Sequence, residues 1–170
     1  MAETVWQGKY LAMIVDGRWE YVARARGIGA AVIVALDGDA VLLVEQYRVP
    51  LGRRCLELPA GLVGDETAGE AALTAAGREL EEETGYRAGR LESLGLFYSS
   101  PGMVSEGYTL VRATDLTRIG PGGGTADEGI SVHRVALAEV ADFIARKRGE
   151  GVAIDGKLLL LLGAGVLAGA

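Results

Sequence analysis

Apolar residues fall into short runs along most of the chain, and polar turn residues separate these runs. Runs of this length that are rich in Val, Ile and Leu and bounded by Gly or Asp are typical of β-strands. Asp16-Gly17 and the segment 37–39 (Asp-Gly-Asp) each lie between two such runs, which favours two hairpins. The pattern predicts strands over 9–14, 19–24, 30–36, 40–44, 94–98, 108–113 and 130–135.

Other segments carry apolar residues at helical spacing. Within 68–84 they recur every fourth position, and Gly85 stands where a left-handed C-terminal cap is expected. The segment 138–148 has an amphipathic pattern, and it ends in basic residues that suit the helix dipole. The uncharged segment 158–170 is shorter than the ~20 residues that span a bilayer, so we expect a buried terminal helix. The mixed order of strands and helices predicts an α+β fold with helices on the sheet.

Composition narrows the function classes. A chain of 170 residues, 49% of them apolar, can bury one sizeable core. Its net charge of −6 argues against nucleic acid as a partner, because phosphate backbones are bound by clustered Lys and Arg. The single Cys55 cannot form an internal disulfide, and no charged-then-apolar leader precedes Trp6. We therefore expect a cytoplasmic protein that binds neither nucleic acid nor membrane.

The run 78–85 (Arg-Glu-Leu-Glu-Glu-Glu-Thr-Gly) concentrates carboxylates on a predicted helix. Residues three and four apart share a helix face, so Glu79, Glu82 and Glu83 are predicted to lie side by side and repel one another. Oxygen-rich clusters of this kind suit hard cations such as Mg2+, which would convert the repulsion into cohesion. The alternative is a solvated acidic face, because charge runs are often only solvated.

Two glycine-bearing segments flank this run in the sequence. The first, 59–64 (Pro-Ala-Gly-Leu-Val-Gly), leads toward the acidic helix and could bring backbone carbonyls close to a ligand. The second, 120–128, is rich in glycine and ends in Asp127 and Glu128. A flexible connector is the alternative interpretation of the second segment.

The acidic run and its surroundings resemble the signature of the Nudix hydrolases. The residues that fit the signature in register are Glu70, Arg78, Glu79, Leu80, Glu82, Glu83 and Gly85. Tyr86 departs from the aliphatic residue that usually follows. Gly64 has the formal opening spacing, whereas 58–61 (Leu-Pro-Ala-Gly) looks like the loop glycine of the family. So many fixed positions make a chance match improbable and favour the metal interpretation.

A subgroup is also indicated. Residues 45–48 (Glu-Gln-Tyr-Arg), 57–61 and 100–106 look like those of ADP-ribose pyrophosphatases and related nucleoside diphosphate sugar hydrolases, and Pro101 lies fifteen residues beyond Tyr86, an offset typical of that subgroup. The resemblance implies a Nudix fold, an α/β/α sandwich with a mixed sheet between helices. It also implies a β-ribbon over 1–28, expected to mediate homodimerisation, and a Nudix domain over 29–170.

The resemblance assigns roles to the acidic residues. Glu79 and Glu83 would bind Mg2+, with Mn2+ as a possible substitute, Glu82 as a further ligand and the Ala60 carbonyl completing the shell. Arg78 would orient these carboxylates, and Glu70 would support the site without contacting the metal, or would contact it through a bound water. Glu81 occupies a variable position and is expected to be solvated.

Catalysis and substrate binding are expected to use residues outside the run. The general base is predicted to be Glu128, with Asp127 and Glu82 as alternatives, on a mobile loop that closes over substrate. The predicted substrate-binding residues are Arg48, Glu57, Ser100, Pro101, Gly102 and Glu106. Trp19 could stack on adenine, although packing is the commoner role of a hairpin aromatic. His133 is predicted to be solvated and Cys55 to be structural.

These assignments imply Mg2+-dependent hydrolysis of ADP-ribose to AMP and ribose 5-phosphate. Another nucleoside diphosphate sugar, such as a GDP-sugar or ADP-glucose, is the first alternative. A nucleotide-binding domain without catalytic activity is the second, although all the glutamates of the signature are present.

Overall fold

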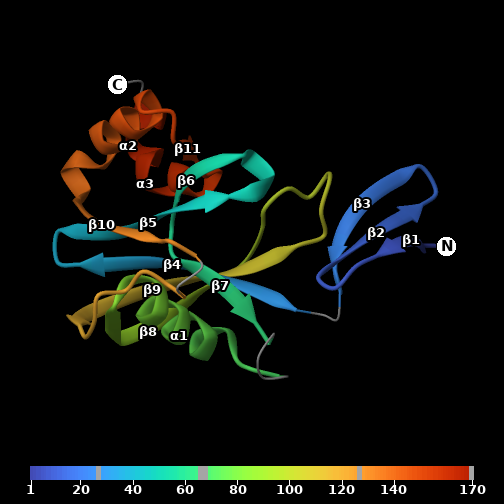
Figure 1. Cartoon of the computed structure of the whole chain (residues 1–170), viewed down its shortest axis with the longest axis horizontal. Helices are drawn as coiled ribbons and strands as arrows, with labels where there is room; N and C mark the ends of the chain where they lie inside the picture. Colours follow the sequence, from blue (N-terminus) through green and yellow to red (C-terminus); the bar gives the residue numbers. More distant parts are fainter. Residues whose placement is uncertain (26–27, 65–68, 126–127, 169–170) are drawn as a thin grey trace.

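The computed structural model describes residues 1–25, 28–64, 69–125 and 128–168, with side chains to residue 163. It has two parts, a small ribbon near the N-terminus and a larger body that contains all the helices (Figure 1). The ribbon consists of β1 (Glu3–Gln7), β2 (Leu11–Asp16) and β3 (Trp19–Arg24), paired antiparallel in that order. The predicted β2–β3 hairpin is confirmed, and β1 was not predicted.

The body is built on one mixed sheet with the strand order β11-β6-β5-β4-β9-β8, on which β10 also pairs with β5 and β7 with β4. Its strands are β4 (Gly29–Asp37), β5 (Ala40–Arg48), β6 (Arg53–Glu57), β7 (Ala60–Val63), β8 (Tyr86–Tyr98), β9 (Gly107–Arg118), β10 (Ser131–Ala136) and β11 (Ala153–Ile154). The β4–β9 and β6–β11 pairs are parallel and the others antiparallel. The mixed sheet that the resemblance implied is therefore confirmed.

Helices cover both faces of this sheet (Figure 1). Helix α1 (Ala72–Thr84) lies on the side of β8 and β9, whereas α2 (Val140–Gly149) and α3 (Leu159–Ala168) lie beside β5, β6 and β10. Short 3-10 turns are η2 (Val49–Leu51), η3 (Leu137–Glu139) and η4 (Gly156–Leu158). Among the described residues, no helix is long and apolar enough to cross a membrane.

Strand β4 supplies side chains to two separate cores. Ala31, Ile33 and Ala35 pack with Ala76 and Leu80 of α1. Val32 and Val34 point to the opposite face and pack in the cluster that contains Val140 and Ile144 of α2. Successive side chains of a strand alternate between faces, so an uninterrupted apolar run is what a strand covered on both sides requires.

Several predicted boundaries differ from the structure. The segment expected as a glycine loop at 59–64 contains strand β7, which pairs with β4. The terminal helix is only partly buried, because Leu158 is enclosed whereas Leu159 and Leu160 are 60% and 55% exposed. Strands β8 and β9 extend well beyond the predicted 94–98 and 108–113. The prediction was too short because charged residues on the exposed face of these strands interrupt the apolar pattern.

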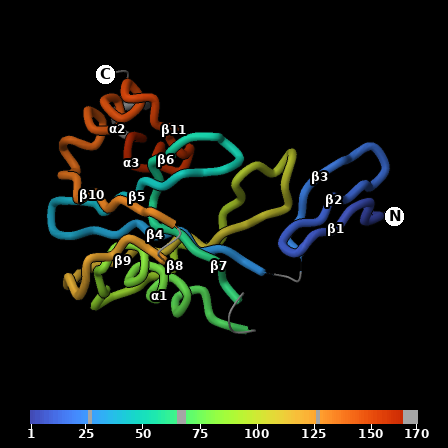
Figure 2. The backbone as a smooth tube through the Cα atoms, viewed as in Figure 1, coloured from blue at the N-terminus to red at the C-terminus, as the bar shows by residue number. Residues whose placement is uncertain are grey.

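The segment 99–106 connects the two parts of the molecule. It leaves the end of β8 and reaches the ribbon, as the tube in Figure 2 shows. There it bonds to both sides of Val22 in β3: the amide of Val22 donates to the Met103 carbonyl at 3.0 Å, and the amide of Ser105 donates to the Val22 carbonyl at 2.9 Å. The ribbon is thus joined to the body by backbone contacts as well as by the chain itself.

Candidate active site

A cavity of about 560 Å³ opens where α1, the sheet and the ribbon meet. It is lined by Arg24, Ala30, Val32, Gln46, Arg48, Glu57, Ala60, Gly61, Leu62, Glu79, Glu83, Ser99, Glu106, Tyr108, Glu128 and Lys157. The size is in the usual range for small-molecule sites. The fold therefore collects in one place charged residues that are spread over most of the sequence.

Glu79 and Glu83 are one helical turn apart on α1, and both line the cavity. The carboxyl group of Glu79 lies against Gly61, where an added Cβ would collide with it. Glu83 is only 6% exposed and accepts a hydrogen bond from the Ala60 amide at 3.0 Å. Strand β7 thus provides the close backbone approach that was expected of a glycine loop.

The pKa of Glu83 is raised from 4.5 to about 8. Burial is the main cause, and the negative charges of Glu79 and Glu128 raise it further, against the Ala60 hydrogen bond and the charge of Arg48. Like charges and burial both disfavour a carboxylate. A positive charge is therefore needed near Glu83 if Glu79, Glu83 and Glu128 are all to be ionised.

Glu82 does not join this group, contrary to the prediction of a shared face. Its side chain is 51% exposed, and Arg78 Nη1 lies 3.4 Å from its Oε2. With 3.6 residues per turn, positions four apart differ by about 40° around the helix, whereas adjacent positions differ by about 100°. Glu79 and Glu83 consequently face the cavity together, and Glu82 points away from Glu83.

Arg78 joins the acidic residues, as the resemblance implied. Its guanidinium lies 3.0 Å from Glu79 Oε1 and 3.6 Å from Glu70 Oε2, and it donates to the Leu62 carbonyl at 3.4 Å. Glu81 was expected to be simply solvated, but it forms an ion pair with Arg87 at 2.7 Å.

The segment that precedes Glu128 is bonded to the end of α1. The amides of Gly123 and Gly124 donate to the carbonyls of Glu83 and Glu82 at 2.8 and 3.0 Å. Glu128 lines the cavity, and its carboxylate accepts a hydrogen bond from the Thr125 amide at 2.7 Å. The residues that lead to Glu128 are thus bonded to the end of α1 through their backbone, while Asp127 lies outside the described residues.

Basic residues from other elements also line the cavity. Arg48 Nε and Nη2 donate to the two carboxylate oxygens of Glu57 at 2.6 and 2.8 Å. Arg24 of β3 pairs with Glu106 at 2.6 Å, and Lys157 of η4 lies on the cavity wall. Sequence reasoning missed Arg24 and Lys157, because neither stands near a motif and only the fold brings them to the site.

Comparison with known proteins agrees with this geometry. The model of the NUDIX domain family matches residues 25–155. The chain belongs to the NUDIX family. The arrangement of Glu70, Arg78, Glu79 and Glu83 is accordingly the structural form of the Nudix signature.

Three relatives illustrate the range within the Nudix family. The chain is 32% identical over 154 residues to "Methanol dehydrogenase activator" of Bacillus methanolicus, covering 86% of this chain and 82% of the relative. It is 35% identical to "GDP-mannose pyrophosphatase" of Enterobacter sp. (strain 638), covering 81% and 72%. It is 41% identical to "ADP-ribose pyrophosphatase" of Bacillus subtilis (strain 168), covering 51% and 45%. The match thus spans just under half of the last relative.

A solved structure supports the fold. "Crystal structure of ADP compounds hydrolase" superposes with a TM-score of 0.69 at 23% identity and covers 100% of this chain and 94% of that chain. The fold of that structure therefore extends over this chain, whereas the NUDIX domain model begins at residue 25.

The 99–106 segment of this Nudix protein divides between two hollows. Ser99 and Glu106 line the main cavity, whereas Pro101 and Gly102 line a second hollow of about 410 Å³ with Trp19. The Ser100 carbonyl accepts the amides of Met103 and Val104. Ser100, Pro101 and Gly102 therefore lie outside the main cavity, and Trp19 is largely exposed beside two of them.

Two further expectations concern residues away from the Nudix signature. His133 was predicted to be solvated, but its ring is half-buried, lies 3.1 Å from Glu45 and is tilted against Phe143. Burial lowers the pKa of His133. Cys55 is enclosed, and burial is the main cause that raises the pKa of its thiol to about 12, which agrees with a structural role.

Proposed function

We propose that this protein hydrolyses the diphosphate of ADP-ribose to AMP and ribose 5-phosphate with the aid of Mg2+. The observation that carries the proposal is that Glu79, Glu83 and Glu128 line the same cavity as Arg24 and Arg48. Nudix relatives with the names of ADP-ribose and GDP-mannose pyrophosphatases support a diphosphate substrate.

A divalent cation fits the acidic end of the cavity. Within the described residues, no three acidic, His or Cys side chains form a ready-made cluster for a metal. Glu79 and Glu83 nevertheless supply two carboxylates at a place where burial and like charge raise the pKa of Glu83. We propose these two as ligands with the Ala60 carbonyl, and Glu82 in a lesser role. When bound, Mg2+ or Mn2+ neutralises phosphoryl oxygens and lowers the pKa of bound water.

The residues of the chain then have separate tasks. Glu128 accepts the proton of the water that attacks one phosphorus, and its carboxylate is oriented by the Thr125 amide. Arg48 is held by Glu57, and Arg24 is held by Glu106. Both guanidinium groups bind the phosphates and disfavour other orientations of the substrate. The oxygen of the water bonds to phosphorus as the bond to the bridging oxygen breaks, and the proton finally goes to solvent.

A GDP-sugar is the second candidate substrate. The relative named GDP-mannose pyrophosphatase aligns over 81% of the chain. The diphosphate would use the same residues, and the choice of nucleoside would depend on the surroundings of Trp19 and Pro101.

We also propose that the protein is a homodimer in which the N-terminal ribbon contacts the second copy. The ribbon exposes Val5, Trp6 and Trp19, and the end of β8 exposes Leu96 and Tyr98. Exposed apolar groups of this size are typical of interaction surfaces. A reducing compartment such as the cytoplasm agrees with the single buried thiol of Cys55.

A substrate panel tests the proposed function. The purified chain is assayed with ADP-ribose, ADP-glucose and GDP-mannose in Mg2+, in Mn2+ and in EDTA, and phosphate is measured after coupled phosphatase treatment. We expect the highest kcat/KM with ADP-ribose, AMP as a product, and complete loss of turnover in EDTA. Absence of ADP-ribose turnover would reject the substrate, and absence of all turnover would favour a binding domain.

A further inference from the structure

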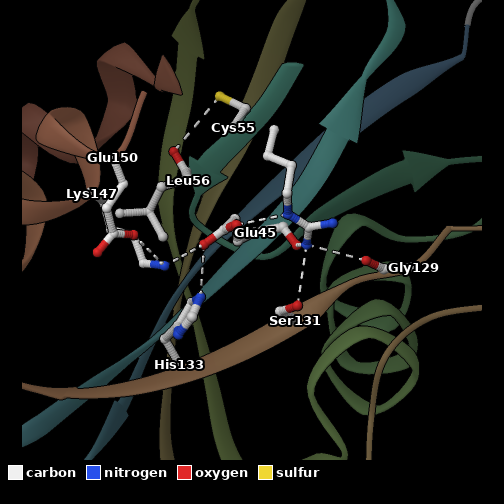
Figure 3. A network of polar contacts seen from close by, with 9 residues as sticks. Glu45, Cys55, Leu56, Gly129, Ser131, His133, Lys147 and Glu150 are labelled. Carbon is white, nitrogen blue, oxygen red and sulfur yellow. Dashed lines mark hydrogen bonds and ion pairs between the residues drawn. The ribbon is translucent and has the colours of Figure 1, made fainter. Parts of the chain in front are cut away.

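A network of ion pairs and hydrogen bonds around the buried Glu45 reaches Gly129, the residue after Glu128 (Figure 3). Its centre is Glu45 of β5, which is 6% exposed. The carboxylate of Glu45 lies 2.7 Å from Arg54 Nε, 2.9 Å from Lys147 Nζ and 3.1 Å from His133 Nε2. Three elements, β6, α2 and β10, therefore meet at one carboxylate.

Arg54 extends this network to the backbone after Glu128. Besides the Glu45 carboxylate, its guanidinium donates through Nη2 to the Glu45 carbonyl at 2.6 Å, to Ser131 Oγ at 3.1 Å and to the Gly129 carbonyl at 3.3 Å. Gly129 is the residue directly after Glu128. A planar guanidinium can hold several oxygens in fixed directions, which an ammonium group does less well.

The segment around Glu128 is thus fixed on both sides, by different means. On the upstream side, the amides of Gly123 and Gly124 bond to the end of α1. On the downstream side, regular pairing with β5 begins at Ser131, opposite Glu45. Gly129 lies between these two regions and has a φ of +57. The carbonyl of Gly129 accepts a hydrogen bond from the Arg54 side chain.

We propose that Arg54, held in place by Glu45, is a positioning residue for Glu128. Arg54 is not part of the cavity wall, so it acts through the backbone of Gly129 and Ser131. The inference rests on the proposed role of Glu128 as the base. Loss of Arg54 displaces the carboxylate relative to the attacking water, and small displacements of reacting groups are costly.

Arg54→Met tests this inference, and the chain offers a closely matched control. Arg134 also donates through Nε to a carboxylate, Asp37, at 2.6 Å and through Nη2 to the carbonyl of the same residue at 3.1 Å. The two arginine side chains are similarly exposed, at 39% and 48%. Arg134 holds the β4–β5 hairpin, however, so Arg134→Met removes a similar ion pair without touching the Glu128 segment.

We expect Arg54→Met to lower kcat by ~10-fold or more with KM changed by less than about 2-fold, because proton transfer is misaligned while substrate contacts remain. Hydrogen exchange of the amides at 128–131 is expected to accelerate. Arg134→Met is expected to change neither, and Arg54→Lys to recover part of kcat. The inference is overturned if Arg54→Met resembles Arg134→Met in both measurements, or if only KM rises.

Ser131→Ala provides a second test that preserves the fold, since Ser131 is exposed at the start of β10. It removes one of the oxygens that Arg54 bonds, and we expect kcat to fall by about 3-fold, a modest loss for one hydrogen bond. An unchanged kcat together with unchanged amide exchange contradicts the inference. Glu128→Gln separates the two proposals: full activity of that variant rejects Glu128 as the base, whereas amide exchange in Arg54→Met still decides whether Arg54 anchors the segment.

Discussion

Glu82 and Glu83 are neighbours in sequence but face different surroundings. Glu83 is buried and accepts a hydrogen bond from the Ala60 amide, whereas Glu82 lies at the surface against Arg78. The two residues are chemically identical, so substitution at each position separates a metal-binding role from a general effect of negative charge on α1.

We expect Glu83→Gln to lower activity by ~100-fold, a usual effect of losing a metal ligand or its immediate support. The required Mg2+ concentration should rise as well. Glu82→Gln should retain activity within about 10-fold, because its carboxylate lies outside the cavity. Titration of kcat against Mg2+ for both variants is the measurement, and equal losses would show that position on the helix is unimportant.

Glu128→Gln tests the assignment of the base. We expect kcat to fall by ~100-fold with little change in KM, because the amide cannot accept the proton but keeps the size of the side chain. Glu81→Gln serves as the control, since Glu81 is paired with Arg87 away from the cavity. Steady-state kinetics with ADP-ribose are the measurement. An unchanged kcat would reject Glu128 as the general base and favour Asp127 or Glu82.

The sequence predicted the members of the Nudix signature because they lie close together, on α1 and in the segment just before it. It did not predict that Glu82 would turn away, because the choice between faces of α1 depends on the position of β7. Arg24 and Lys157 could not be found, since each reaches the cavity from a distant element.

At the level of elements, the end of α1 depends on Gly85. Gly85 has φ +74, as the predicted cap requires, and an added Cβ would collide with the backbone of Gly120 and Gly122. Gly151 follows α2 with φ +84, but its Cβ position is open.

Gly85→Ala and Gly151→Ala should therefore differ. Gly151→Ala is expected to lower the free energy of unfolding by about 1 kcal/mol, because only the left-handed backbone is unfavourable for alanine. Gly85→Ala adds the collision, and we expect the free energy of unfolding to fall by ~3 kcal/mol or more. Urea unfolding of both variants measures the difference, and equal losses would mean that the 120–122 segment adapts readily.

The network at Glu45 should make stability sensitive to acid. Burial alone would raise the pKa of Glu45, but hydrogen bonds from Lys147 and Arg54 outweigh it and lower the pKa from 4.5 to about 2. The unfolded chain then binds more protons in this window, so the stabilising contribution is complete above pH 4.5 and is lost as the pH falls toward about 2.

Glu45→Gln removes this titration. We expect the variant to be less stable at neutral pH, because Arg54 and Lys147 lose a charged partner, and to show a shallower decline in unfolding free energy below pH ~5. Urea unfolding at several pH values is the measurement. Parallel pH profiles for the two proteins would contradict the role of Glu45.

The sequence predicted strands best where the sheet is covered on both faces, as in β4 and β5, because uninterrupted aliphatic runs are distinctive. It missed β6 and β7, whose short sequences contain Arg53, Arg54 and Gly61 and whose strand character arises from pairing with β5 and β4. Such strands are determined by their neighbours more than by their own composition.

The whole molecule presents an exposed ribbon beside a covered sheet, and this shape leads to the prediction of a homodimer. We expect light scattering at micromolar concentration to give twice the chain mass of 17.7 kDa. Trp6→Glu on the exposed ribbon should shift the mass toward that of one chain, whereas Leu137→Glu, equally an exposed apolar position but on η3, should not. A monomeric parent protein would refute this assembly.

The hydrogen bonds between 123–124 and the end of α1 are made by main-chain atoms alone. These bonds need glycine at 123 and 124, where φ is +109 and +69, but they require no particular side chain in the other loops around the cavity. The spacing between the carboxylates of α1 and Glu128 can therefore stay constant while the loops that contact the nucleoside diverge in sequence. Under the proposed function, this separation would allow related proteins to exchange one nucleotide sugar for another without changing the residues proposed to break the diphosphate.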